Sequence, residues 1–124
     1  STASWAYSTA AWRASDNDAN NTIYVLTGLQ EEVADCTFKQ NITQAGGGGG
    51  VSSQIGIGLN TTGTASGMFS SVGLAVSGHT PTASFVSLPL LGINKINAIE
   101  LSNAATTTYV GTSANMMLKA SWRG

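Results

Sequence analysis

The chain has 124 residues, of which only 9% are Asp, Glu, Lys or Arg, against about 25% in an ordinary soluble domain. The five basic residues are scattered along a chain of formal net charge −1, which argues against a nucleic-acid partner because phosphate binding needs clustered cations. No run of about 18 apolar residues occurs, so insertion into a membrane is not predicted.

Alternating apolar residues and β-branched runs, bounded by Gly, Pro and Asn, predict about eight short strands. In chain order the strands are expected at 22–26, 33–43, 51–59, 68–76, 83–91, 93–101, 106–110 and 116–123. Five consecutive glycines at 46–50 predict a surface loop or hairpin tip. The only helical tendency is a single turn within 8–19.

The strand expected at 51–59 places Ile55 and Ile57 on one face and Gly56 and Gly58 on the other. Glycines on one face allow a second backbone or a large aromatic ring to approach closely. Short strands at this spacing, without helices between them, predict an all-β fold: an antiparallel β-sandwich of the jelly-roll kind. We expect one domain, 1–124, that is the C-terminal part of a longer chain and, with so little charge, is stabilised by assembly.

Candidate catalytic and zinc-binding residues are sparse. His79 is the single histidine and sits in a Gly-His-Thr-Pro turn, and no Gly-x-Ser-x-Gly motif accompanies it, so an exposed turn residue is favoured over a catalytic one. Zinc needs three or four Cys or His ligands, whereas the chain offers only Cys36 and His79. Cys36 is expected to be a small buried hydrophobe.

The carboxylates also form no obvious catalytic pair. Glu31 and Glu32 are adjacent, so on a strand they would face opposite sides. Glu100 lies among apolar residues, and either faces solvent or is buried with a hydrogen-bonding or cationic partner. Asp16 and Asp18 alternate as in calcium loops, but the Gly and Glu that such loops need later are absent, so a polar loop is favoured over calcium. We expect no catalytic residue, metal or cofactor.

Six aromatic residues have two interpretations. Rings near Asn and Asp can stack on sugars, whereas large rings more often fill a core or an interface, and the second interpretation is favoured. They are Trp5, Tyr7, Trp12, Tyr24, Tyr109 and Trp122.

Four segments of the C-terminal third resemble the end of a bacteriophage tail-fibre or spike head domain. They are Leu-Pro-Leu-Leu-Gly-Ile-Asn at 88–94, Ala-Ile-Glu at 98–100, Thr-Thr-Tyr-Val-Gly at 107–111 and Leu-Lys-Ala-Ser-Trp-Arg-Gly at 118–124. The resemblance implies a small sandwich similar to the tumour-necrosis-factor and C1q jelly roll, assembled as a homotrimer on the virion surface or extracellularly. The implied partners are sister copies, other virion proteins and a host-cell receptor such as a polysaccharide.

The resulting hypothesis is a virion-surface adhesin that binds host glycan or protein non-covalently, with contacts in the loops 12–21, 44–50, 60–67 and 78–82. The candidate ligand-binding residues are Trp12, Arg13, Asp16, Asp18 and His79. One alternative is a capsid decoration protein without a host ligand. A second is a small carbohydrate-binding module or a depolymerase.

Overall fold

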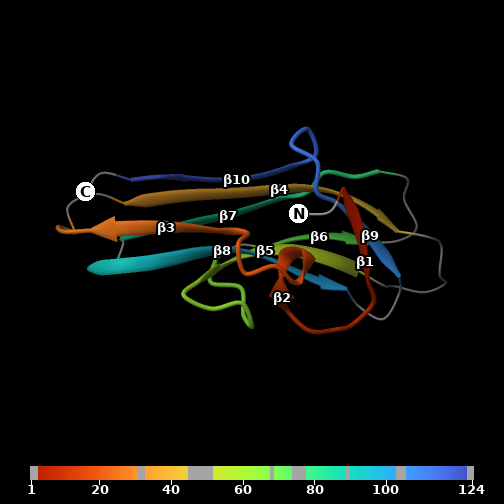
Figure 1. Ribbon diagram of the computed structural model, residues 1–124, viewed down its shortest axis with the longest axis horizontal. Coiled ribbons are helices and arrows are strands. Elements are labelled where there is room, and N and C mark those ends of the chain that lie inside the picture. Colours follow the sequence, from red (N-terminus) through yellow and green to blue (C-terminus); the bar gives the residue numbers. More distant parts are fainter. Residues whose placement is uncertain are drawn as a thin grey trace.

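The computed structural model describes residues 3–30, 33–44, 52–67, 69–73, 78–88, 90–102 and 106–122. Within this part of the chain, ten strands and one short 3₁₀ turn form two antiparallel sheets that face each other as two layers (Figure 1). None of the described residues belongs to a helix long and apolar enough to cross a membrane. The prediction of an all-β, antiparallel fold is confirmed.

The first sheet is built around β4. Its strands are β1 (Ser4–Tyr7), β4 (Ala34–Gln44), β7 (Thr82–Ser87), β9 (Thr107–Val110) and β10 (Met116–Ser121). β7 pairs with one edge of β4, while β9 and β10 follow one another along the other edge. β1 pairs with β9 and closes that side of the sheet.

The second sheet is built around β8 in the same way. Its strands are β2 (Arg13–Ala14), β3 (Thr22–Thr27), β5 (Ser52–Leu59), β6 (Ser70–Gly73) and β8 (Gly92–Ser102). β2 and β3 follow one another along one edge of β8, separated by the 3₁₀ turn η1 (Ser15–Asn17). β5 pairs with the other edge, and β6 pairs with β5.

The strand pairs are nested along the chain. If β2–β3 and β9–β10 each count as one interrupted strand, then β1 pairs with the last strand and β2–β3 with the one before it. β4 then pairs with β7, and β5 with β6. The chain therefore resembles one long hairpin that has been rolled so that alternate pairs fall in opposite sheets.

The core lies between the inner faces of the two sheets, because period-two alternation points every second side chain inward. Buried apolar residues come from both layers: Val25, Cys36, Phe38, Ile42, Ile55, Ile57, Ala83, Ile96, Ala98 and Tyr109. The prediction for the glycine face of β5 is also confirmed. The Trp12 ring lies 3.2 Å from the point where a Gly56 Cβ would stand, and the Thr61 carbonyl occupies the corresponding space at Gly58.

Several predicted boundaries differ from the structure. Alternation does not predict β1 or β2, although the resemblance to tail-fibre heads implies an opening strand at Trp12-Arg13, which overlaps β2. The helical tendency within 8–19 yields only η1. The strand expected at 83–91 ends at Ser87, two residues before Pro89, and the one expected at 68–76 is described only as β6. The polyglycine segment 46–50 lies outside the described residues.

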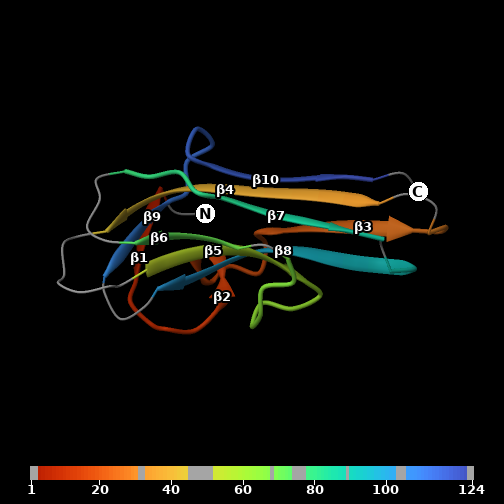
Figure 2. The same cartoon turned by 180° about the vertical axis from the view of Figure 1, so that it is seen from behind.

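One end of the sandwich carries many exposed aliphatic side chains. The loops from β3 to β4 and from β7 to β8 both lie there, because Thr27 pairs with Gly92 and Ala34 with Ser87 (Figures 1 and 2). Eight side chains at this end are more than half exposed, and we call them the apolar end: Leu26, Leu29, Val33, Val86, Leu88, Leu90, Leu91 and Ile93.

Candidate functional site

A pocket of about 390 Å³ lies on the outer face of the second sheet. Its lining comes from β3, β8 and the two loops that follow β2 and β5: Ala19, Thr22, Tyr24, Asn60, Thr61, Thr62, Lys95 and Asn97. Two of the four loops expected to contact a ligand, 12–21 and 60–67, therefore meet at this pocket. We refer to it as the Tyr24 pocket.

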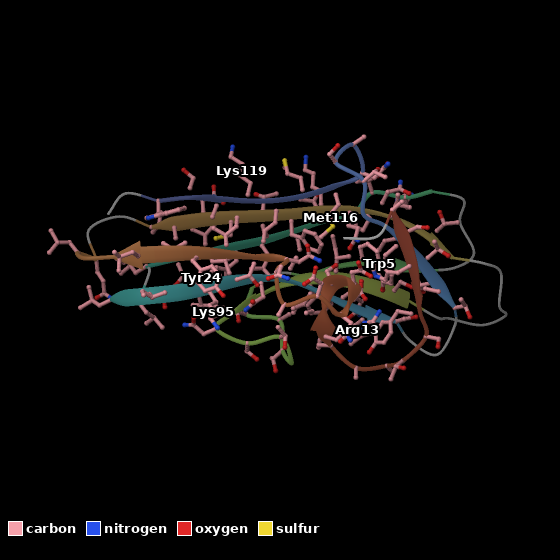
Figure 3. All side chains as sticks on the ribbon, in the orientation of Figure 1. Trp5, Arg13, Tyr24, Lys95, Met116 and Lys119 are labelled. Atoms are coloured by element: carbon pink, nitrogen blue, oxygen red, sulfur yellow. The ribbon has the colours of Figure 1, made fainter. Side chains whose placement is uncertain are left out.

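One wall of the Tyr24 pocket is an aromatic ring beside a cation. Tyr24 and Lys95 are direct cross-strand partners on β3 and β8, so their side chains project from the same face (Figure 3). The ring is 61% exposed, and the Lys95 ammonium nitrogen lies 5.6 Å from its centroid. The wall thus offers an apolar face for stacking and a positive charge next to it.

The rim of the pocket is held by Asn60, which adopts a positive φ of 58°. Asparagine tolerates this left-handed conformation better than most residues. Its Oδ1 accepts a hydrogen bond from the backbone N–H of Lys95 at 2.8 Å, and its Nδ2 donates to Oδ1 of Asn94 at 3.0 Å. The loop after β5 is thereby tied to β8.

The floor of the pocket is held by Asn97. Its Nδ2 donates to the carbonyl oxygens of Gly58 at 3.0 Å and Thr61 at 3.1 Å, and its Oδ1 accepts from the Thr22 hydroxyl at 2.7 Å. Because these amides already have partners, the pocket has a fixed shape before any ligand binds, and this lowers the ordering cost of binding.

A second polar feature, the Glu100 cluster, lies between the sheets. The Glu100 carboxylate is fully buried, and its Oε1 accepts from Arg13 Nε at 2.8 Å and Nη2 at 2.7 Å. Trp5 Nε1 donates to Oε2 at 2.7 Å, and the Ser15 hydroxyl lies 3.4 Å from the same oxygen. The Tyr7 ring covers the guanidinium carbon of Arg13 at 3.7 Å. Of the two interpretations left open for Glu100, the buried one with a cationic partner is correct.

Burial raises the pKa of Glu100 above its ordinary value, while hydrogen bonds from Trp5 and Arg13 and the positive charge of Arg13 oppose that shift. The carboxylate is enclosed by protein groups that satisfy both oxygens, and it has no exposed surface. It joins β1 and β2 to β8, so its role is to hold the N-terminal segment to the sandwich rather than to contact a substrate.

The structure separates the five residues expected to bind a ligand. Trp12 packs over Gly56 and against Phe69, with 5.9 Å between the Trp12 and Phe69 ring centroids. Arg13 belongs to the Glu100 cluster. Asp16 lies in η1, with φ 59°.

The other two predicted residues lie elsewhere. Asp18 Oδ1 accepts hydrogen bonds from the backbone and side-chain nitrogens of Asn20, which closes a local turn next to the Tyr24 pocket. His79 is exposed and pairs with Ile42 in the first sheet. The Tyr24 pocket is lined by none of the five, and their part in ligand binding stays a prediction.

Metal and thiol chemistry have little support in the described part of the chain. No group of three or more His, Cys, Asp and Glu side chains there could hold a metal ion. The prediction for Cys36 is confirmed, because its side chain is buried in the core. Burial, with a smaller effect of Asp35, raises the pKa of its thiol to about 11, so the reactive thiolate is scarce at neutral pH.

Tyr24 is among the six rings for which sugar stacking was weighed against packing in a core or interface, and the structure leaves its ring 61% exposed. Lys95 was not selected from the sequence. In the run Thr-Ile-Tyr-Val-Leu-Thr at 22–27 both parities contain apolar residues, so alternation could not tell which face is exposed. The structure buries Val25 and Thr27 and exposes Tyr24 and Leu26. No local pattern marks Tyr24 as outward-facing, because its parity also holds the apolar Leu26.

Comparison of the chain with protein-family models, curated proteins and solved structures finds no match. The function therefore has to be argued from the Tyr24 pocket, the Glu100 cluster and the apolar end.

Proposed function

We propose that this chain is a non-catalytic receptor-binding domain, a jelly-roll head of a phage tail fibre or similar virion-surface adhesin, which assembles as a homotrimer and binds host-surface carbohydrate. The observation that carries the proposal is the exposed Tyr24 ring beside a preformed pocket of Asn and Thr side chains. A ring face binds the apolar face of a sugar, and the hydroxyl groups of Thr61 and Thr62 in the same pocket can form hydrogen bonds to it.

The nested strand pairing supports the jelly-roll part of the proposal. In chain order, counting each interrupted strand once, one sheet holds strands one, eight, three and six, and the other holds two, seven, four and five. This order results when a hairpin of eight strands is rolled into two sheets, as in jelly rolls. It agrees with the fold implied by the resemblance to tail-fibre heads.

The charge beside the ring points to acidic sugars as the ligand class. Within the described residues no carboxylate lies at ion-pair distance from Lys95, so its ammonium group is available to a ligand. A carboxylated sugar stacked on Tyr24 would place its negative charge within reach of this group. A single site of this kind is weak, and repetition around a three-fold axis would raise the overall affinity.

The test is binding of the purified protein to host envelope polysaccharide, with acidic and neutral polysaccharides in parallel. Tyr24→Ala should weaken binding by about tenfold or more, which corresponds to about 1.4 kcal/mol. Met117→Ala is the control, because Met117 is another exposed large apolar side chain that does not line the pocket, and this variant should bind as the wild type does. Equal binding by Tyr24→Ala and wild type would contradict the proposed site.

One observation supports the alternative of a capsid decoration protein: the exposed apolar end offers a surface for docking on the capsid. The two functions separate when labelled protein is offered to host cells and to phage capsids. An adhesin binds cells, whereas a decoration protein binds capsids and ignores cells.

A further inference from the structure

The apolar end is unusual for an isolated domain. Each of its eight side chains is more than half exposed, so together they leave the equivalent of at least four whole aliphatic side chains in water. An aliphatic side chain that is withdrawn from water removes roughly 60–120 Å² of apolar surface, which gives roughly 250–500 Å² at this end. Patches of that size on soluble proteins mark interaction surfaces.

Seven of the eight side chains lie on the second sheet or on the two connections at this end. Leu26 and Ile93 are direct cross-strand partners and project from the outer face of the second sheet. Leu29 and Val33 follow β3, and Leu88, Leu90 and Leu91 connect β7 to β8 at the same end. Val86 stands apart from these, because it projects from the outer face of the first sheet, opposite Asp35.

We infer that copies of this chain associate through the apolar end, which thus forms the interface around the symmetry axis of the proposed oligomer. The available area agrees with this partner. A standard interface buries about 800 Å² on each side, of which somewhat more than half is apolar, or roughly 450 Å². The apolar end supplies an amount of this order.

The sequence of one loop at this end suits a contact between copies. The loop 88–91 is Leu-Pro-Leu-Leu, so it brings no charges of its own into such a contact. Glu31 and Glu32, in the other loop, lie outside the described residues.

The test compares solution mass, measured by light scattering, of the wild type and of Leu91→Lys with Ile93→Lys. The wild type should have a mass of several chains, and the variant should fall to the 12.6 kDa of one chain, because each lysine would have to be desolvated in the interface. The control, Ser113→Lys with Met117→Lys, adds the same two charges to exposed positions away from the apolar end and should keep the wild-type mass.

A milder variant guards against loss of folding. Leu26→Thr with Ile93→Thr places β-branched residues at both paired strand positions, so the sheet should form, while the concentration at which the oligomer dissociates should rise by at least about tenfold. Circular dichroism verifies that each variant retains its strands.

This inference rests on the proposed oligomer. The mass measurements distinguish a failure of the interface from a failure of the oligomer. A wild type of two chains that the lysine variant breaks into monomers supports the interface and contradicts the trimer. A wild-type oligomer of any size that both variants leave intact overturns the interface and spares the oligomer. A wild-type monomer overturns both, and its flotation with phosphatidylcholine–phosphatidylserine vesicles would assign the surface to lipid.

Discussion

The Glu100 cluster and the apolar end invert the usual distribution of polar and apolar groups. The Glu100 cluster buries a carboxylate completely and gives both of its oxygens partners. The apolar end leaves eight aliphatic side chains more than half exposed, with no cover from the described chain. The polar cluster is thus complete within one copy, whereas the apolar surface is completed by a sister copy in the interface that we infer. Stability of the fold should depend on the first and assembly on the second.

The largest effect is expected from Arg13→Met, which removes the cation from the Glu100 cluster. An unpaired buried carboxylate remains, and at neutral pH the free energy of unfolding should fall by about 3–5 kcal/mol. Denaturant unfolding measures the change. A loss below about 1 kcal/mol would contradict the role of the Glu100 cluster in holding β1 and β2 to β8.

The pH dependence of Arg13→Met has a defined sign. Folding already raises the pKa of Glu100, so the native state binds this proton more tightly than the unfolded chain does. This contribution is fully present below the ordinary pKa of Glu and is lost as the pH rises through the raised value. Without Arg13 the pKa rises further. The deficit of Arg13→Met relative to wild type should therefore shrink on acidification, as unfolding at successive pH values would show.

Two isoleucines on β8 provide the sharpest contrast between core and apolar end. Ile96 is 3% exposed in the core, and Ile93 is 71% exposed at the apolar end. Ile96→Thr should cost about 2–4 kcal/mol, because it removes apolar contacts and buries a hydroxyl group. Ile93→Thr should change the stability of a dissociated chain by no more than about 0.5 kcal/mol. Equal losses of unfolding free energy at Ile96 and Ile93 would contradict the contrast between a buried core position and an exposed apolar end.

A smaller effect is expected from Trp5→Phe. The ring that stacks on Tyr109 is largely kept, but the indole N–H that donates to Glu100 Oε2 is lost. Loss of one donor to a buried charge should cost about 1–3 kcal/mol. Unfolding of the Arg13→Met, Trp5→Phe double variant would reveal coupling, because the two donors share one carboxylate. Strictly additive losses would argue against a shared cluster.

Much of the fold could be predicted from the sequence, because one signal dominates it. Alternation in 51–59 and β-branched runs elsewhere located most strands, and the glycine face of β5 indicated the close approach of Trp12 and Thr61. Alternation and β-branched runs missed β1 and β2 because neither contains a Val, Ile or Thr, whereas β9, which is no longer than β1, contains three such residues. They are held by long-range contacts, such as the pairing of Arg13 with Glu100.

The candidate site was less predictable. The loops 12–21 and 60–67 were expected to contact a ligand, and both contribute to the Tyr24 pocket. Tyr24 and Lys95 become neighbours only through the register of β3 on β8, which no local pattern encodes. The apolar end likewise depends on two loops, distant in sequence, meeting at one end of the sandwich.

The central claim is that one folded copy leaves an apolar surface that only sister copies cover. Sedimentation equilibrium of the wild-type protein over a dilution series tests this claim most directly. The account predicts a mass of three times 12.6 kDa that persists to low micromolar concentration. A single chain of 12.6 kDa at every concentration would contradict it.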